Sequence, residues 1–103
     1  MREIRLAKLD KTRPVVILTR ELALGAMNKV TVAPITSTVR GLSSEVIVDE
    51  RNGLDHRSAI SLDNVLTISQ AALGRRIGFL TAAQEAELSR AVILAYDLAL
   101  PLD

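Results

Sequence analysis

The chain has 103 residues and a net charge of +1, from 13 basic and 12 acidic residues, which fits a single domain over residues 1–103 and excludes a uniformly basic nucleic-acid coat. It has no cysteine and one histidine, which excludes a disulfide framework, a thiolate nucleophile, a Cys-ligated zinc and a two-histidine acid–base pair. No apolar run approaches the roughly 20 residues that span a membrane and no signal peptide is recognisable, so we expect a cytoplasmic protein with no membrane partner.

The first third of the chain predicts three strands. Residues 2–9 place Ile4 and Leu6 on one face, and residues 14–18 form a continuous apolar run typical of a strand buried on both faces. Pro14 belongs at the start of that strand because it lacks a backbone donor. After a turn at residues 25–28, a third strand covers residues 30–33, and we expect Pro34 to break or bulge it.

The middle of the chain predicts three further strands. Residues 45–48 form a short one, and the Asn52-Gly53 dipeptide predicts a turn. Residues 58–68 alternate well enough for one continuous strand. Ser69 is expected to cap a helix of one or two turns through Leu73, and residues 77–80 form the last strand.

A capping box at residues 81–84 opens a helix that we expect to reach about Leu98. Apolar side chains at helical spacing are expected to pack on the sheet: Leu88, Val92, Ala95 and Leu98 or Ala99. Many short strands and one terminal helix predict a mainly β fold, a small barrel or sandwich with an appended C-terminal helix.

The near-neutral total conceals an uneven distribution of charge. Residues 1–40 carry eight basic and three acidic residues, a net +5, whereas residues 41–103 carry five basic and nine acidic residues, a net −4. A basic N-terminal portion can bind a polyanion even when the whole chain is neutral. Chance segregation of solvated side chains would give the same count.

The chain lacks a phosphate loop and the sequence motifs of metalloproteases and serine hydrolases, and we interpret His56 as a surface histidine. The remaining candidates for chemistry are arginine and hydroxyl side chains. Arg13 lies at the start of a predicted strand, and the hydroxyl cluster at residues 36–38 is followed by Arg40. A guanidinium binds phosphate through two hydrogen bonds, and such a pair can stabilise a phosphodiester transition state without a metal. Each residue alone is more typical of a structural role.

Four segments, taken in order, resemble the MazF/PemK family of toxins, the mRNA interferases of bacterial toxin–antitoxin modules. They are residues 13–18 (RPVVIL), 32–37 (VAPITS), 58–68 (SAISLDNVLTI) and 73–80 (LGRRIGFL), followed by the terminal helix. The resemblance covers about residues 8–100. It implies a small SH3-like β-barrel of the Kid/CcdB type that works as a homodimer.

The resemblance also implies an activity. Such enzymes cut single-stranded RNA at short sequences without metal or other cofactor, leaving a 2′,3′-cyclic phosphate and a 5′-hydroxyl, and their antitoxins, here a MazE-like one, inhibit them with an acidic tail. The family's catalytic arginine falls on Arg13 and its catalytic threonine on Thr36. Polar neighbours are our candidates for RNA contacts: Lys11, Thr12, Ser37, Thr38, Arg40 and Asn64.

The chain departs from the family before Arg13, where only Lys11 and Thr12 follow Leu9-Asp10 instead of a long Gly-containing loop. We expect a more open groove as a result. Two other functions stay open. One is a CcdB-like toxin that binds DNA gyrase, although that family uses a tryptophan near its C-terminus and this chain has none. The other is a non-catalytic barrel that only binds partners.

Overall fold

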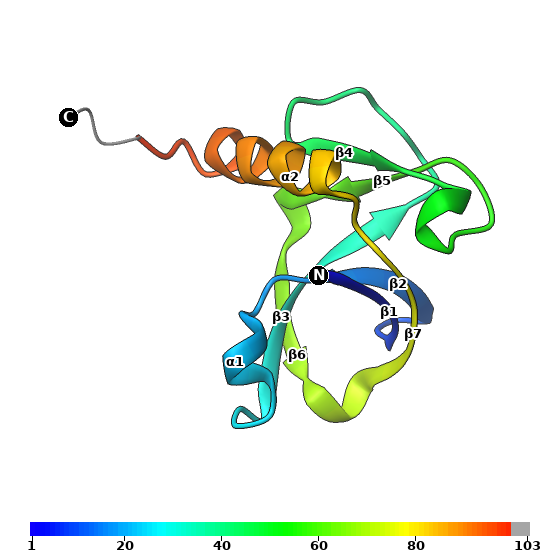
Figure 1. The fold of residues 1–103 in the computed structure, drawn as a ribbon, viewed down its shortest axis with the longest axis vertical. Coiled ribbons are helices and arrows are strands. Elements are labelled where there is room, and N and C mark those ends of the chain that lie inside the picture. The colour runs from blue at the N-terminus through cyan, green and yellow to red at the C-terminus, as the bar shows by residue number, and fades with distance from the viewer. Residues whose placement is uncertain (100–103) are drawn as a thin grey trace.

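The structure is a computed structural model that describes residues 1–99. Seven antiparallel strands curve into a half-barrel, and one long helix covers its upper part (Figure 1). The strands are β1 (Glu3–Lys8), β2 (Thr12–Ile17), β3 (Lys29–Thr36), β4 (Glu45–Val48), β5 (Ser58–Ser61), β6 (Leu66–Ser69) and β7 (Leu73–Phe79). The helices are α1 (Glu21–Leu24) and α2 (Ala82–Ala95), with 3₁₀ turns η1 (Glu50–Asn52), η2 (Leu62–Asn64) and η3 (Gln70–Ala72). The predicted class, mainly β with a C-terminal helix, is confirmed.

Strand β3 organises the sheet. One of its edges pairs with β2, which continues to β1 and β7, and its other edge pairs first with β6 and then with β5. Strand β4 adds to the far side of β5. This arrangement places the end of β3, the start of β2 and the turn after β5 near one another, which is where the candidate site lies.

The predicted break at Pro34 is wrong, because β3 continues through it to Thr36. Residues 29–32 of β3 pair with β6 and residues 35–36 pair with β5. Pro34 therefore lies where the ladder passes from one partner strand to the next. A proline, which cannot donate a backbone hydrogen bond, is tolerated where the ladder is already interrupted.

The single strand predicted over residues 58–68 is also wrong, because η2 divides it into β5 and β6. The Asn64 side-chain amide donates to Ser61 Oγ at 2.7 Å and closes the turn, while Leu62 is fully buried at its start. The turn redirects the chain from the upper to the lower part of β3. The alternation of apolar residues gave no indication of this bend.

Other boundaries shift by a few residues. Strand β2 begins at Thr12, and β7 begins at Leu73 rather than at residue 77. The short helix after Ser69 is confirmed as η3, whose first turn is capped by the Ser69 hydroxyl accepting from the Ala71 N–H at 3.2 Å. Helix α1 was not predicted. It has four residues and no side-chain cap, so the sequence carries little signal for it.

Helix α2 begins at the predicted capping box but ends at Ala95, before Leu98. The chain turns at Asp97, which has a left-handed φ of 53°, so Leu98 and Ala99 do not continue the helix and are exposed. The expected packing of Leu88, Val92 and Ala95 is confirmed, since they belong to or contact the upper core. That core joins α2 to β4 and β5, and a second cluster around Val15, Ile17 and Val32 fills the lower half-barrel.

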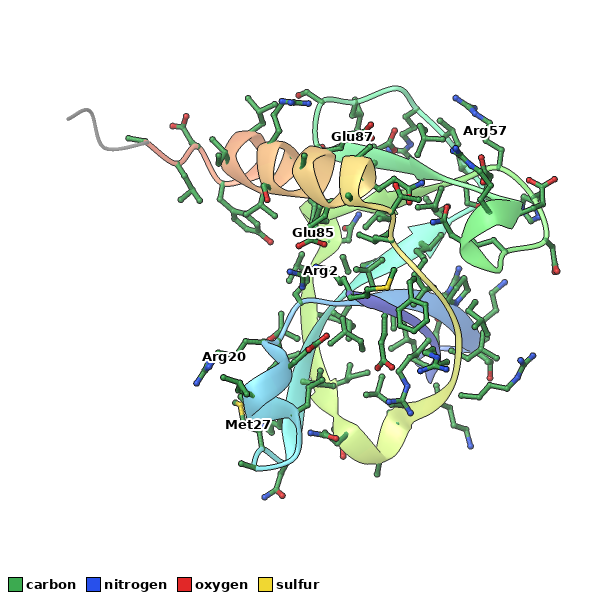
Figure 2. The ribbon with its side chains drawn as sticks, in the orientation of Figure 1. Arg2, Arg20, Met27, Arg57, Glu85 and Glu87 are labelled. Carbon is green, nitrogen blue, oxygen red and sulfur yellow. The ribbon has the colours of Figure 1, made fainter. Side chains whose placement is uncertain are left out.

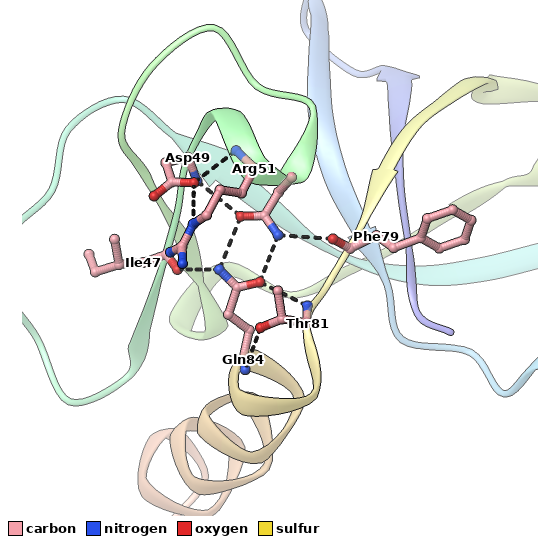
Figure 3. A network of polar contacts seen from close by, with 7 residues as sticks. Ile47, Asp49, Arg51, Phe79, Thr81 and Gln84 are labelled. Atoms are coloured by element: carbon pink, nitrogen blue, oxygen red, sulfur yellow. Dashed lines mark hydrogen bonds and ion pairs between the residues drawn. The ribbon is translucent and has the colours of Figure 1, made fainter.

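A buried pair of amides attaches α2 to the sheet (Figure 3). Asn52 Nδ2 donates to Gln84 Oε1 at 2.6 Å, and Gln84 Nε2 donates back to Asn52 Oδ1 at 3.0 Å. Asn52 also donates to the Phe79 carbonyl and accepts from the Asp49 N–H, whereas Gln84 donates to the Ile47 carbonyl and accepts from the Thr81 N–H. Each amide thus uses both donors and both acceptor positions.

Close backbone packing and one ion pair complete this attachment. A Cβ on Gly78 would lie 1.9 Å from the Asn52 carbonyl oxygen, so only glycine fits there. Arg2, before β1, faces Glu85 in the first turn of α2 (Figure 2) and donates to its carboxylate at 2.7 and 2.8 Å. These hydrogen bonds lower the pKa of Glu85 below its ordinary value. They attach the start of the chain to the start of the helix.

Candidate active site

Arg13 is held at the start of β2 by a carboxylate from the preceding turn. Its Nε donates to Asp10 Oδ1 at 2.9 Å and its Nη2 to Asp10 Oδ2 at 3.1 Å. The pair uses one edge of the guanidinium, and among residues 1–99 the Nη1 group donates to no partner. A planar guanidinium can then present its terminal edge to a phosphate while the other edge stays bound to Asp10.

The same contact shifts both ionisation equilibria. Hydrogen bonding from Arg13, with a smaller contribution from the Lys11 N–H, lowers the pKa of Asp10 to about 2. The hydrogen bond with Asp10 also raises the pKa of Arg13 above its ordinary value. Both groups therefore stay charged at neutral pH.

Thr36 is the last residue of β3, and its hydroxyl begins the following turn. Its Oγ1 accepts the Thr38 N–H at 3.1 Å. Because the hydroxyl acts as an acceptor in this contact, its own proton stays available to donate to an incoming oxygen. Thr36 is half-buried and Thr38 is exposed.

Arg13 and Thr36 line one open groove of about 890 Å³. We call this cavity the groove. Of the predicted RNA-contacting residues, Thr38, Arg40 and Asn64 also line it. Leu9, Pro34, Ile35, Leu42 and Leu66 supply its apolar surface.

Three of the predicted RNA contacts are not brought into the groove. Thr12 follows the alternation of β2 and lies on the opposite face from Arg13, in a smaller pocket that Lys8 and Arg75 also line. Lys11 is an exposed residue of the β1–β2 turn, and Ser37 is exposed and is not among the residues that line the groove. The prediction treated neighbours in sequence as neighbours in space, which fails along a strand because successive side chains alternate.

Part of the groove lining, which we call the acidic wall, consists of Glu45 and Asp63 and was missed by the sequence analysis. Glu45 Oε1 accepts the backbone N–H groups of Arg40 and Leu42, each at 3.1 Å. This carboxylate fixes the loop that contains Gly41, whose φ of 73° favours glycine. Asp63 Oδ2 accepts the Ser44 hydroxyl at 2.5 Å. Asp10 is the one additional site residue that the sequence could have indicated. It lies three residues before Arg13, and side chains at that spacing can meet across a tight turn.

The interpretation of His56 as a surface histidine is confirmed. His56 lies in the exposed loop before β5 and is absent from the groove lining. Within residues 1–99, no group of three or more His, Cys, Asp or Glu side chains is arranged to hold a metal ion. No helix in that range is long and apolar enough to cross a membrane.

Comparison with known proteins adds independent information. Residues 3–96 match the family described as PemK-like, MazF-like toxin of type II toxin–antitoxin system. The chain is 55% identical over 98 residues, or 95% of both chains, to Endoribonuclease MazF3 of Mycobacterium tuberculosis.

Solved structures agree with these matches. The Mycobacterium tuberculosis toxin MazF-mt6 superposes with a TM-score of 0.93 at 53% identity, covering 95% of this chain and 99% of that one. A mycobacterial endoribonuclease in complex with its cognate antitoxin shares the fold, with a TM-score of 0.85 at 21% identity over 96% and 95% of the two chains.

Proposed function

The chain belongs to the PemK-like, MazF-like toxins of type II toxin–antitoxin systems and is an endoribonuclease, and from that premise we propose that it cuts single-stranded RNA, sequence-specifically and without metal, in the groove that contains Arg13 and Thr36. The observation that carries the proposal is the pairing of an oriented guanidinium with a hydroxyl that is free to donate, in a cavity open to solvent. Both groups can donate hydrogen bonds to the oxygens of a phosphodiester.

The proposed reaction is an attack by the RNA's own 2′-hydroxyl. The 2′-oxygen forms a bond to the adjacent phosphorus and loses its proton, the bond from phosphorus to the 5′-oxygen breaks, and that oxygen takes up a proton. The products are a 2′,3′-cyclic phosphate and a 5′-hydroxyl. No water is consumed in this step.

Arg13 acts chiefly by stabilising negative charge. The charge on the non-bridging oxygens grows in the phosphorane-like transition state, and donors fixed in advance stabilise it most. Asp10 orients the guanidinium, so that Arg13 does not need to be ordered by the substrate. A guanidinium is too weak an acid to exchange protons readily at neutral pH, so we assign it charge stabilisation rather than the role of general base.

Thr36 donates to a non-bridging oxygen or orients the attacking 2′-hydroxyl. Arg40 and Thr38 would contact neighbouring phosphates from the lining of the groove, and the Asn64 amide would read a base edge because an amide both donates and accepts. We retain Lys11, Thr12 and Ser37 as RNA contacts only outside the groove.

We further propose that the protein works as a homodimer with an SH3-like, Kid/CcdB-type barrel in each protomer. Large apolar side chains stay exposed near the end of α2: Leu94, Tyr96 and Leu98. Such a patch is typical of a surface that another protein covers. A cognate MazE-like antitoxin with an acidic C-terminal tail would neutralise the toxin by lying over the groove, where Arg13 and Arg40 offer positive charge.

The test is incubation of the pure protein with end-labelled single-stranded RNA in EDTA. Cuts at defined positions, with 2′,3′-cyclic phosphate and 5′-hydroxyl ends, support the proposal. Cleavage that needs added metal, or that leaves 3′-hydroxyl ends, contradicts it. No cleavage together with capture of DNA gyrase would favour the CcdB-like alternative.

A further inference from the structure

The β1–β2 hairpin presents two different polar faces. Asp10 and Arg13 line the groove, whereas Lys8 and Thr12, which are cross-strand partners, line a second pocket of about 400 Å³. Arg75 of β7 lines that second pocket too. Lys11 lies in the turn that separates the two cavities. We call Lys8, Lys11, Thr12 and Arg75 the basic surface.

The positive charge of the basic surface is not neutralised by neighbouring carboxylates. Strands β1 and β7 together contain four basic residues and one acidic residue, Glu3. Glu3 lies 3.8 Å from Arg5 and 3.6 Å from Arg76, at the other end of β1. The Asp10 carboxylate already forms an ion pair with Arg13. Among residues 1–99, none of the ion pairs includes a member of the basic surface.

We propose that RNA leaving the groove crosses the hairpin at Lys11 and that its flanking phosphates bind the basic surface. This inference rests on the proposed function, and it adds a second binding region for the RNA outside the groove where the cut is made. Lysine, arginine and threonine are the side chains that commonly contact phosphate, and such contacts carry affinity without sequence information. With no aromatic side chain in its lining, the pocket suits the RNA backbone better than stacked bases.

Continuity with the groove favours RNA over an acidic protein segment as the occupant. Thr12 and Arg13 are consecutive residues of β2 and each lines a different cavity, so the two cavities lie on either side of the hairpin. Arg13 lies two residues after Lys11, so an RNA strand with one phosphate at Arg13 can leave the groove past the β1–β2 turn. On this path it meets the basic surface.

The test compares two double variants of equal net charge. Lys8→Ala/Arg75→Ala removes two cations of the basic surface, and Arg57→Ala/Arg90→Ala removes two exposed arginines elsewhere, in the loop before β5 and on α2. Two RNAs are used, one just long enough to fill the groove and one extended on both sides. For binding, the attacking 2′-hydroxyl is replaced by hydrogen, so that no cleavage occurs.

With the long RNA, the first variant should bind roughly tenfold more weakly at 0.15 M salt, and the slope of log K against log salt should decrease by about 1.4, as expected for two lost phosphate contacts. Its kcat on intact RNA should be unchanged and its KM raised. With the short RNA, it should match the wild type. The second variant should match the wild type with both RNAs.

Equal binding of the long RNA by the first variant and the wild type overturns the proposal, as does an equal loss in the two double variants. If the first variant resists inhibition by the acidic antitoxin tail while its RNA binding is unchanged, the basic surface serves the antitoxin and the proposal is wrong. A wild-type protein that does not cut RNA at all refutes the proposed function instead, so the two failures are distinguishable.

Discussion

The buried amide pair of Asn52 and Gln84 and the solvent-exposed pair of Asp10 and Arg13 are both built from polar side chains, but they serve opposite purposes. In the amide pair, every donor and acceptor is used, and both side chains are excluded from water. In the Asp10–Arg13 pair, one edge of the guanidinium has no protein partner among residues 1–99, and it faces a cavity.

This difference distinguishes polar side chains that stabilise the fold from polar side chains that can bind a ligand. A buried polar group without a partner costs free energy, so a saturated network marks a position that supports the fold. An oriented group with spare donors at an open surface costs little while water solvates it, and it is ready to bind a ligand. The two regions should therefore respond to substitution in opposite ways.

The largest expected effect is on catalysis. Arg13→Ala should reduce the cleavage rate by roughly a hundredfold or more, because removing one preorganised donor to a developing oxyanion has that effect. Its stability should be nearly unchanged, because the Arg13–Asp10 pair is exposed. Cleavage kinetics and thermal unfolding measure the two quantities, and Arg57→Ala is the matched control. Retained cleavage by the folded variant would refute the role of Arg13.

The amide pair should show the reverse. Gln84→Ala leaves buried donors and acceptors of Asn52 without partners, which should decrease the free energy of unfolding by about 2–4 kcal/mol. Each kcal/mol lowers Tm by roughly 4–8 °C in a domain of this size. At a temperature where the variant is folded, kcat should be unchanged, because the pair lies away from the groove.

Ser89→Ala is the control for that substitution, since Ser89 is an exposed residue of the same helix and should change stability by less than about 0.5 kcal/mol. A Gln84→Ala protein as stable as the wild type would mean that water replaces the lost partners. The contrast between the two regions would then be wrong.

A smaller effect is expected at Glu45, which lines the groove and orders the loop from Arg40 to Leu42. Glu45→Ala frees the N–H groups of Arg40 and Leu42, so the loop loses its fixed path and Arg40 its placement. We expect KM for RNA to rise roughly fivefold, about 1 kcal/mol, with little change in kcat. Glu45→Gln keeps an acceptor oxygen and should restore most of the affinity. If the glutamine variant fails as badly as the alanine variant, the charge of Glu45 matters rather than its hydrogen bonds.

Sequence patterns predicted the fold class because strand and helix signals depend on neighbouring residues. The capping box at Thr81 and the apolar run after Pro14 each located an element start within two residues. The failures at Pro34 and at η2 share a cause: both mark the place where β3 changes partner, and pairing between distant strands leaves no local signal. Helix α2 ends earlier than predicted for a different reason: the chain turns at Asp97, which has a left-handed backbone although it is not a glycine.

For the site, the family motifs directed attention to Arg13 and Thr36, and the structure brings both to one cavity. Their catalytic roles stay predictions. Sequence could not reveal the acidic wall, because Glu45 and Asp63 come from different elements that only the sheet brings together. The sequence also could not show that Thr12 and Arg13 lie on opposite faces of β2, since the alternation of side chains can be assigned only once the limits of the strand are known.

The smallest expected effect is a titration, and it tests whether the Asp10–Arg13 pair forms in solution. Hydrogen bonding from Arg13 lowers the pKa of Asp10 from an ordinary 3.8 to about 2. A lowered carboxyl pKa means that the pair stabilises the folded state fully above pH 3.8 and that this contribution is lost as the pH falls through about 2. In Arg13→Gln, the Asp10 pKa should return toward 3.8, as followed by NMR of the side-chain carboxyl carbon. A wild-type Asp10 that already titrates near 3.8 would mean that Arg13 is not held before RNA arrives, and that the substrate itself must order the guanidinium.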